Sequence, residues 1–143
     1  MSDQLLLLTH AAATLYMAGL IWFVQLVHYP LMAKVGGQDY RDYQQLHERR
    51  TTLAVAPAMF TELGCAAYLA LRTPDTISPV LAWAGLLLVA LLWLSTAMLQ
   101  VPCHNKLGKG FDERAHRRLV TTNWLRTALW SARGVIALVM LSQ

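Results

Sequence analysis

The chain has 143 residues, of which 56% are hydrophobic and 14% are charged, whereas soluble domains average about half and about a quarter. This length is that of one domain, and the shortage of charge argues against a soluble globular protein. The net charge is +4, but no nucleic-acid motif accompanies the basic residues, so we expect no nucleic-acid partner.

Four stretches of the chain carry almost no charge. A helix rises about 1.5 Å per residue and the hydrocarbon core is about 30 Å thick, so about 20 residues cross it. The first and third stretches are uncharged, the second contains only Glu62, and the fourth, from Leu119 onwards, contains only Arg126 and Arg133. We predict an all-α integral membrane four-helix bundle that forms a single domain over residues 1–143. Its transmembrane helices are expected at about 5–29, 51–71, 79–101 and 118–141.

Basic residues are concentrated in the first and third connections between these helices. Nine of them lie there, against Arg72 alone in the second connection and none in the two tails: Lys34, Arg41, Arg49, Arg50, Lys106, Lys109, Arg114, Arg117 and Arg118. Short cytoplasmic loops carry an excess of Lys and Arg. We therefore expect loops one and three to be cytoplasmic and both termini non-cytoplasmic, in a bacterial-type inner (plasma) membrane whose anionic headgroups attract the basic residues.

Two features refine the helix ends. Tyr40, Tyr43, Leu46 and His47 fall on one face of an amphipathic segment, which is expected either to lie at the interface or to continue into the second span. Asp112 precedes the fourth helix and is predicted to be its N-cap, so this helix should begin outside the bilayer.

The fourth helix places its polar residues on one face, comprising His116, Asn123, Arg126, Trp130 and Arg133. A charged side chain at the bilayer centre costs about 2.5–3.5 kcal/mol on insertion scales. The face is therefore predicted to point into the bundle. Glu62 lies at a matching depth, so a buried Glu62–Arg126/Arg133 charge cluster is expected. These charges either serve a site or only hold the helices together.

The histidines form a second pattern. His28, His47, His104 and His116 come from four segments, and the predicted topology brings all four to the cytoplasmic end. Neutral imidazole is the commonest metal ligand, so the four are candidate ligands of a transition metal or haem. The alternative is a set of interfacial histidines near the headgroups. His10 is about 27 Å from His28 along the helix, so these two cannot bind one metal.

The segment "TNWLRTALWSARG" (122–134) resembles the last helix of the anthrone-oxygenase-like family of small four-helix membrane proteins, and "YPLMAKVG" (29–36) adds to the likeness. The resemblance implies oxidation of polycyclic aromatic substrates with dioxygen, with Asn123 and Arg126 as site residues.

A second stretch, "THAAATLYMAGLIWF" followed by "HERRTTLAVAPAM", is similar to the four-helix, haem-associated protoporphyrinogen oxidases of bacterial membranes. That likeness implies a haem role for His10. The sequence departs from the pattern in the third helix, where residues 80–101 lack the expected lysine.

The favoured hypothesis is a membrane oxidoreductase or oxygenase that acts on a hydrophobic, aromatic small molecule. His47, Asn123 and Arg126 are the catalytic candidates, and His10, His28 and His104 are the candidate cofactor ligands. Haem, a transition metal and chemistry without a cofactor are all left open. The rival hypothesis is a non-catalytic small subunit of a larger membrane complex or a transport component, and a homo-oligomer is a further option.

Overall fold

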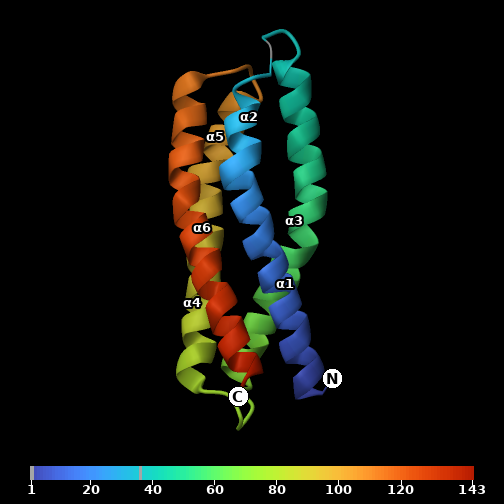
Figure 1. Cartoon of the computed structure of the whole chain (residues 1–143), viewed down its shortest axis with the longest axis vertical. Helices are drawn as coiled ribbons and strands as arrows, with labels where there is room; N and C mark the ends of the chain where they lie inside the picture. The colour runs from blue at the N-terminus through green and yellow to red at the C-terminus, as the bar shows by residue number, and fades with distance from the viewer. Residues whose placement is uncertain (1, 36) are drawn as a thin grey trace.

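The computed structural model describes residues 2–35 and 37–143, and every regular element in these ranges is helical. Four long helices run side by side as a bundle, with both termini at one end (Figure 1). They span Asp3–Met32, Tyr40–Leu71, Pro79–Leu107 and Glu113–Leu141, and each is long and apolar enough to cross a membrane. The chain is therefore a multi-pass membrane protein in its architecture, as the sequence predicted.

The first and third long helices share one local device. The first consists of α1 (Asp3–Phe23), the π-helical turn η1 (Val24–His28) and α2 (Tyr29–Met32); the third consists of α4 (Pro79–Ser95), η2 (Thr96–Gln100) and α5 (Val101–Leu107). Pro30 and Pro102 are the second residues of α2 and α5. A proline lacks the N–H of a regular helical turn and its ring crowds the preceding carbonyl, and a π-helical turn can absorb this. Both helices consequently continue beyond residues 29 and 101, where the sequence placed their membrane spans.

The second and fourth long helices, α3 (Tyr40–Leu71) and α6 (Glu113–Leu141), extend at their N-terminal ends beyond the predicted spans. The amphipathic segment of the first connection thus continues into α3, which remains one helix through Pro57. The N-cap prediction for α6 is confirmed, because Asp112 accepts a hydrogen bond from the N–H of Ala115 at 2.7 Å. The Lys106 ammonium, 2.8 Å from Asp112, is the main cause that lowers the pKa of this carboxyl.

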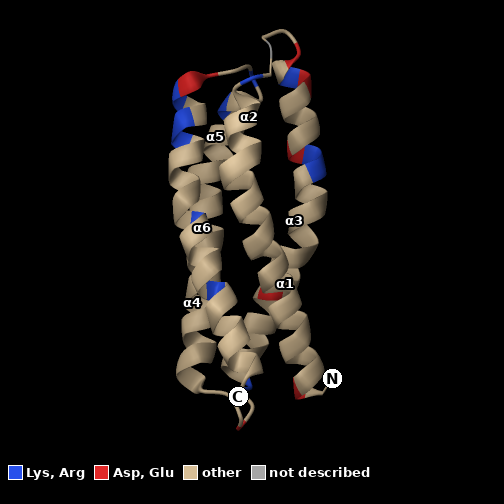
Figure 2. Ribbon diagram, in the orientation of Figure 1, with Lys and Arg blue, Asp and Glu red and all other residues tan. Residues whose placement is uncertain are grey.

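Charge is distributed along the bundle as a membrane requires. Lys and Arg gather at the end opposite the termini, which we call the basic end, while a few charged positions lie deep between the helices (Figure 2). Large apolar side chains cover the outside, among them Leu53, Phe60, Val80, Leu87 and Val135. An apolar outer surface of this kind is suited to lipid, since a soluble monomer rarely exposes contiguous apolar patches beyond a few hundred Å².

The apolar core consists of three clusters along the bundle. The cluster near the basic end contains Tyr29, Met32, Tyr40, Leu107 and Leu119. The central cluster contains Met17, Ile21, Met59, Leu92 and Trp130. The cluster near the termini contains Leu6, Leu69, Ile77, Ala82 and Met140. The buried polar side chains, among them His10, Glu62, Asn123 and Arg133, lie among these clusters, so each sits in an environment that makes an unpaired polar atom costly.

Candidate functional site

One buried polar network is centred on the ion pair between Glu62 and Arg133. Arg133 Nε donates to Glu62 Oε1 at 3.1 Å, and Trp130 Nε1 donates to Glu62 Oε2 at 3.1 Å. Each of these three residues is at most 1% exposed. The carboxylate is thus satisfied on both oxygens. The predicted partnership of Glu62 with Arg133 is confirmed, whereas Arg126 lies outside this cluster.

His10 belongs to the same network, which the sequence analysis did not foresee. Arg133 Nη2 lies 2.8 Å from His10 Nε2. Since a guanidinium can only donate, His10 accepts at Nε2 and carries its proton on Nδ1. Arg133 also packs against Gly85, where a Cβ would come within 2.6 Å of Nη1. We call Glu62, Trp130, Arg133 and His10 the Glu62 cluster. Its internal contacts indicate a role in holding the helices together.

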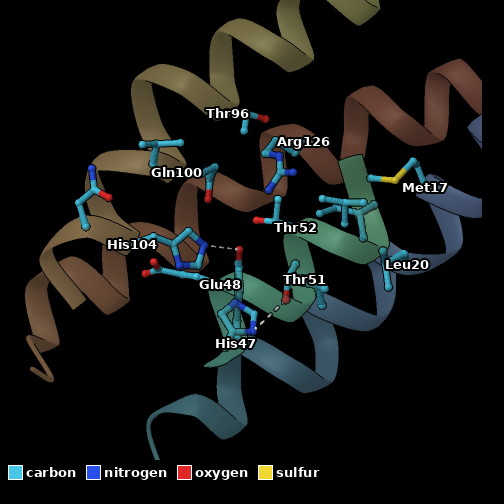
Figure 3. A pocket seen from close by; sticks show the side chains of 16 residues that line it. Met17, Leu20, His47, Glu48, Thr51, Thr52, Thr96, Gln100, His104 and Arg126 are labelled. Carbon is cyan, nitrogen blue, oxygen red and sulfur yellow. Dashed lines mark hydrogen bonds between the residues drawn. The ribbon is translucent and has the colours of Figure 1, made fainter. Parts of the chain in front are cut away.

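Closer to the basic end, the helices enclose a cavity of about 250 Å³ (Figure 3). Its apolar wall comes from α1, η1 and α3 and consists of Met17, Leu20, Ile21, Val24 and Val55. Its polar wall comes from α3, η2, α5 and α6 and includes His47, Glu48, Thr51, Thr52, Thr96, Gln100, His104 and Arg126. A cavity with an apolar wall and a few convergent polar groups is the usual form of a small-molecule site.

Arg126 contributes the only guanidinium among the lining residues. Two consecutive hydrogen bonds orient its side chain. Arg126 Nη1 donates to Asn123 Oδ1 at 3.1 Å, and Asn123 Nδ2 donates to Gln25 Oε1 at 2.8 Å. The guanidinium also lies over Trp130, 5.0 Å from the ring centroid. Within the described residues no carboxylate lies within 4 Å of it, and its buried Nε has no hydrogen-bond partner. Arg126 is therefore an oriented, uncompensated positive charge at the cavity.

His104 uses both of its ring nitrogens for protein contacts. Gln44 Nε2 lies 2.9 Å from His104 Nδ1 and also donates to the Glu48 carboxylate at 2.9 Å, so the amide nitrogen must face both. His104 Nδ1 then accepts, and its Nε2–H donates to the Tyr29 hydroxyl oxygen at 3.2 Å. Glu48 thereby fixes the tautomer of His104 through Gln44. With both nitrogens engaged, His104 is poorly placed to act as a base on a ligand.

His47 differs from His104 because only one of its ring nitrogens is engaged. His47 Nδ1 lies 2.9 Å from His28 Nε2 and 3.1 Å from the Thr51 hydroxyl. Its Nε2 makes no hydrogen bond to any residue that the structure describes, and His47 lines the cavity. When His47 Nδ1 donates to His28, its Nε2 has a free lone pair. His47 is thus the histidine best placed to accept a proton from a ligand.

The structure gathers three of the predicted ligand histidines without forming a metal centre. The ring centroids of His47 lie 4.5 Å from His28 and 5.5 Å from His104, while His116 Nε2 donates to the Tyr29 carbonyl at 2.8 Å. Among residues 2–35 and 37–143, no group of three or more His, Cys, Asp or Glu side chains is arranged to hold a metal ion. A metal there would require the present hydrogen bonds to break, and metal binding stays a prediction.

The haem assignment rests on His10, His28 and His104, which the structure divides between two places. His10 contacts Arg133 in the Glu62 cluster, whereas His104 lines the cavity and His28 stacks on His47. His104, the haem candidate that lines the cavity, already uses both of its ring nitrogens in contacts with Gln44 and Tyr29. The residues present therefore do not fit a haem at the cavity.

Sequence reasoning found the histidines, Asn123 and Arg126, but it missed Glu48 and the remaining neutral residues of the site. His47, His104 and Arg126 line the cavity, and Asn123 holds Arg126. The neutral residues that complete the site are Gln25, Tyr29, Gln44 and Gln100, all buried. Gln25 and Gln100 each stand in an otherwise apolar stretch, and that exception was the available signal.

Comparisons with protein-family models, with curated proteins and with solved structures found no match to the chain.

Proposed function

We propose that the cavity binds a small aromatic molecule through an acidic oxygen and that the protein oxidises this molecule with dioxygen. The observation that carries the proposal is Arg126, a buried guanidinium that faces the cavity with no carboxylate of the described residues within 4 Å. An unpaired buried charge costs several kcal/mol. An anionic ligand oxygen would remove that cost, as Glu62 does for Arg133.

The rest of the cavity supports an aromatic ligand. A dry apolar cavity of about 150 Å³ can hold benzene, so a volume of about 250 Å³ has room for more than one ring. The wall of Met17, Leu20, Ile21, Val24 and Val55 would contact the rings. The polar wall, on α3, η2, α5 and α6, would contact the ligand's oxygen atoms. Such a ligand is amphiphilic and would reach the site from the bilayer.

Chemically, His47 would act as the base and Arg126 as the group that stabilises the anion. The resemblance to anthrone-oxygenase-like proteins supports anthrone, a three-ring ketone with an acidic methylene, as a substrate model. His47 takes one methylene proton, and the electron pair moves to the ketone oxygen beside Arg126. Dioxygen then accepts electrons from this anion. One oxygen atom becomes the new carbonyl and the other leaves as water with the two hydrogens, so anthrone and O₂ give anthraquinone and H₂O. Asn123 is a positioning residue that acts through Arg126.

Oxygen uptake tests the proposal. Purified protein in nanodiscs should consume one O₂ per anthrone and form anthraquinone, above the rate of protein-free nanodiscs. His47→Gln should lower kcat, by about 10²-fold or more if His47 is the general base, and Arg126→Met should lower it too. Catalysis equal to that of empty nanodiscs would contradict the oxygenase assignment. Ligand binding that depends on Arg126, without any turnover, would instead favour the non-catalytic or transport hypothesis.

For the membrane topology, we propose that the basic end faces the cytoplasm of a bacterial-type inner membrane. Nine Lys and Arg lie in or beside the two connections at this end, which is the bias the positive-inside rule describes. The native thiols, Cys65 and Cys103, are buried. In intact cells, an impermeant maleimide should therefore label Ser142→Cys at the C-terminus but not Lys109→Cys. The reverse pattern would contradict this orientation.

A further inference from the structure

Gln100 is a buried side chain of the cavity that has no role in the proposed oxidation. It is the last residue of η2, it lines the cavity, and only 2% of its surface is exposed. Its Nε2 donates to the hydroxyl of Thr122 at 3.0 Å. That hydroxyl donates its single proton to the Arg118 carbonyl at 2.7 Å, so it can only accept from Gln100. The amide is thereby oriented with its nitrogen towards α6.

This orientation leaves Gln100 Oε1 without a partner. The atom is buried, and no hydrogen-bond donor among the described residues reaches it. Buried amide oxygens in folded proteins are nearly always hydrogen-bonded, and each exception calls for an explanation. Here the explanation is suggested by position, since the same cavity contains the uncompensated Arg126. The site therefore contains a positively charged donor, Arg126, without a carboxylate partner among the described residues. It also contains a neutral acceptor, Gln100 Oε1, without a donor among them.

We infer that the ligand carries two polar groups: an acidic oxygen that binds Arg126 and a neutral hydroxyl that donates to Gln100 Oε1. The substrate class is thus a dihydroxylated or more highly oxygenated aromatic molecule. This inference rests on the proposed ligand-binding function of the cavity and narrows it. A ligand that lacks the second hydroxyl leaves the amide oxygen unpaired and binds more weakly. Sites built to hydrogen-bond a hydroxyl discriminate strongly against analogues without it.

Isothermal titration calorimetry on the full chain in nanodiscs tests the inference with 1-naphthol and a series of dihydroxynaphthalene isomers. At least one isomer should bind the wild type about ten-fold more tightly than 1-naphthol, as expected when a buried acceptor gains its partner. Gln100→Leu should abolish this gain, so that this variant binds the isomer and 1-naphthol with affinities equal within about two-fold. The isomer that shows the gain identifies the spacing of the two oxygens.

Ser95→Ala serves as the matched control. Ser95 also has a buried side-chain oxygen without a hydrogen-bond partner among the described residues, but it does not line the cavity. Its replacement should leave the preference for the dihydroxy isomer intact. The inference is overturned if no isomer exceeds 1-naphthol, or if the gain persists in Gln100→Leu. Failure of 1-naphthol itself to bind, or binding that ignores Arg126→Met, would instead overturn the proposed function and the inference with it.

Discussion

Replacement of Glu62 by Gln tests whether the buried ion pair holds the bundle together. The substitution keeps the size of the side chain but removes its charge. One amide oxygen can still accept from Arg133, while the amide nitrogen then faces the Trp130 Nε1–H, so two donors oppose each other. Arg133 is 0% exposed and stays protonated. Breaking a buried pair by removing one partner costs about 3–5 kcal/mol, and we expect that loss in the free energy of unfolding.

The assay is a double-mutant cycle measured by denaturant titration in detergent, with helicity followed by circular dichroism. Glu62→Gln and Arg133→Met should each destabilise the protein by about 3–5 kcal/mol. Their combination should cost far less than the sum, because replacing both partners removes the uncompensated charge. The exposed pair Arg117–Glu113, at 2.6 Å, is the control. Glu113→Gln should change stability by less than about 1 kcal/mol. Additive losses at Glu62 and Arg133 would refute the reasoning.

Two further predictions concern other parts of the fold. Gly85→Ala should destabilise the bundle by about 1–3 kcal/mol, because its methyl group would displace the Arg133 guanidinium from Glu62. At Gly64 an added Cβ would meet no described atom within 4 Å, so Gly64→Ala should be neutral or stabilising in the same denaturant titration. Equal effects of the two substitutions would contradict this. Asp112→Ala should speed amide hydrogen exchange at Ala115, whose N–H it caps. The pKa of Asp112 is lowered in the folded state. Its contribution to the stability of the helix end is therefore present above about pH 4, the ordinary carboxyl value, and is lost as pH falls through the folded pKa. Protection at Ala115 that is independent of pH in this range would disprove the cap's role.

Much of this structure was predictable because lipid imposes severe constraints on a sequence. Uncharged stretches of about 20 residues have few alternatives to a transmembrane helix, and all four predicted spans lie within long helices. Because burying an unpaired charge in lipid is costly, the polar face of α6 was predicted to point into the bundle. Its residues Asn123, Arg126, Trp130 and Arg133 are all buried. Matched depth along two helices also predicted that Glu62 pairs with Arg126 or Arg133.

The details that were missed depend on rotation about the helix axis and on local helix geometry. Sequence depth allowed Glu62 to reach either Arg126 or Arg133, and only the packed bundle selects Arg133. The π-helical turns η1 and η2 rotate the residues that follow them, including Tyr29 and His104, away from the positions of a regular helix. Neutral glutamines give little signal in a composition analysis, yet Gln25, Gln44 and Gln100 orient the site.

The central claim is that Arg126 binds an acidic aromatic molecule as its anion, and the ionisation of bound 4-nitrophenol tests it most directly. This phenol becomes yellow when it ionises, so absorbance reports its charge state in the cavity, and its methyl ether, 4-nitroanisole, is the control without an acidic proton. In the wild type, the bound dye should ionise at least about one pH unit below the free dye, because an opposite charge within about 4–6 Å favours the anion. Arg126→Met should abolish the shift, and the double variant Glu62→Gln/Arg133→Met should keep it. A bound dye that ionises at the same pH as the free dye, or a shift that survives Arg126→Met, would contradict the account.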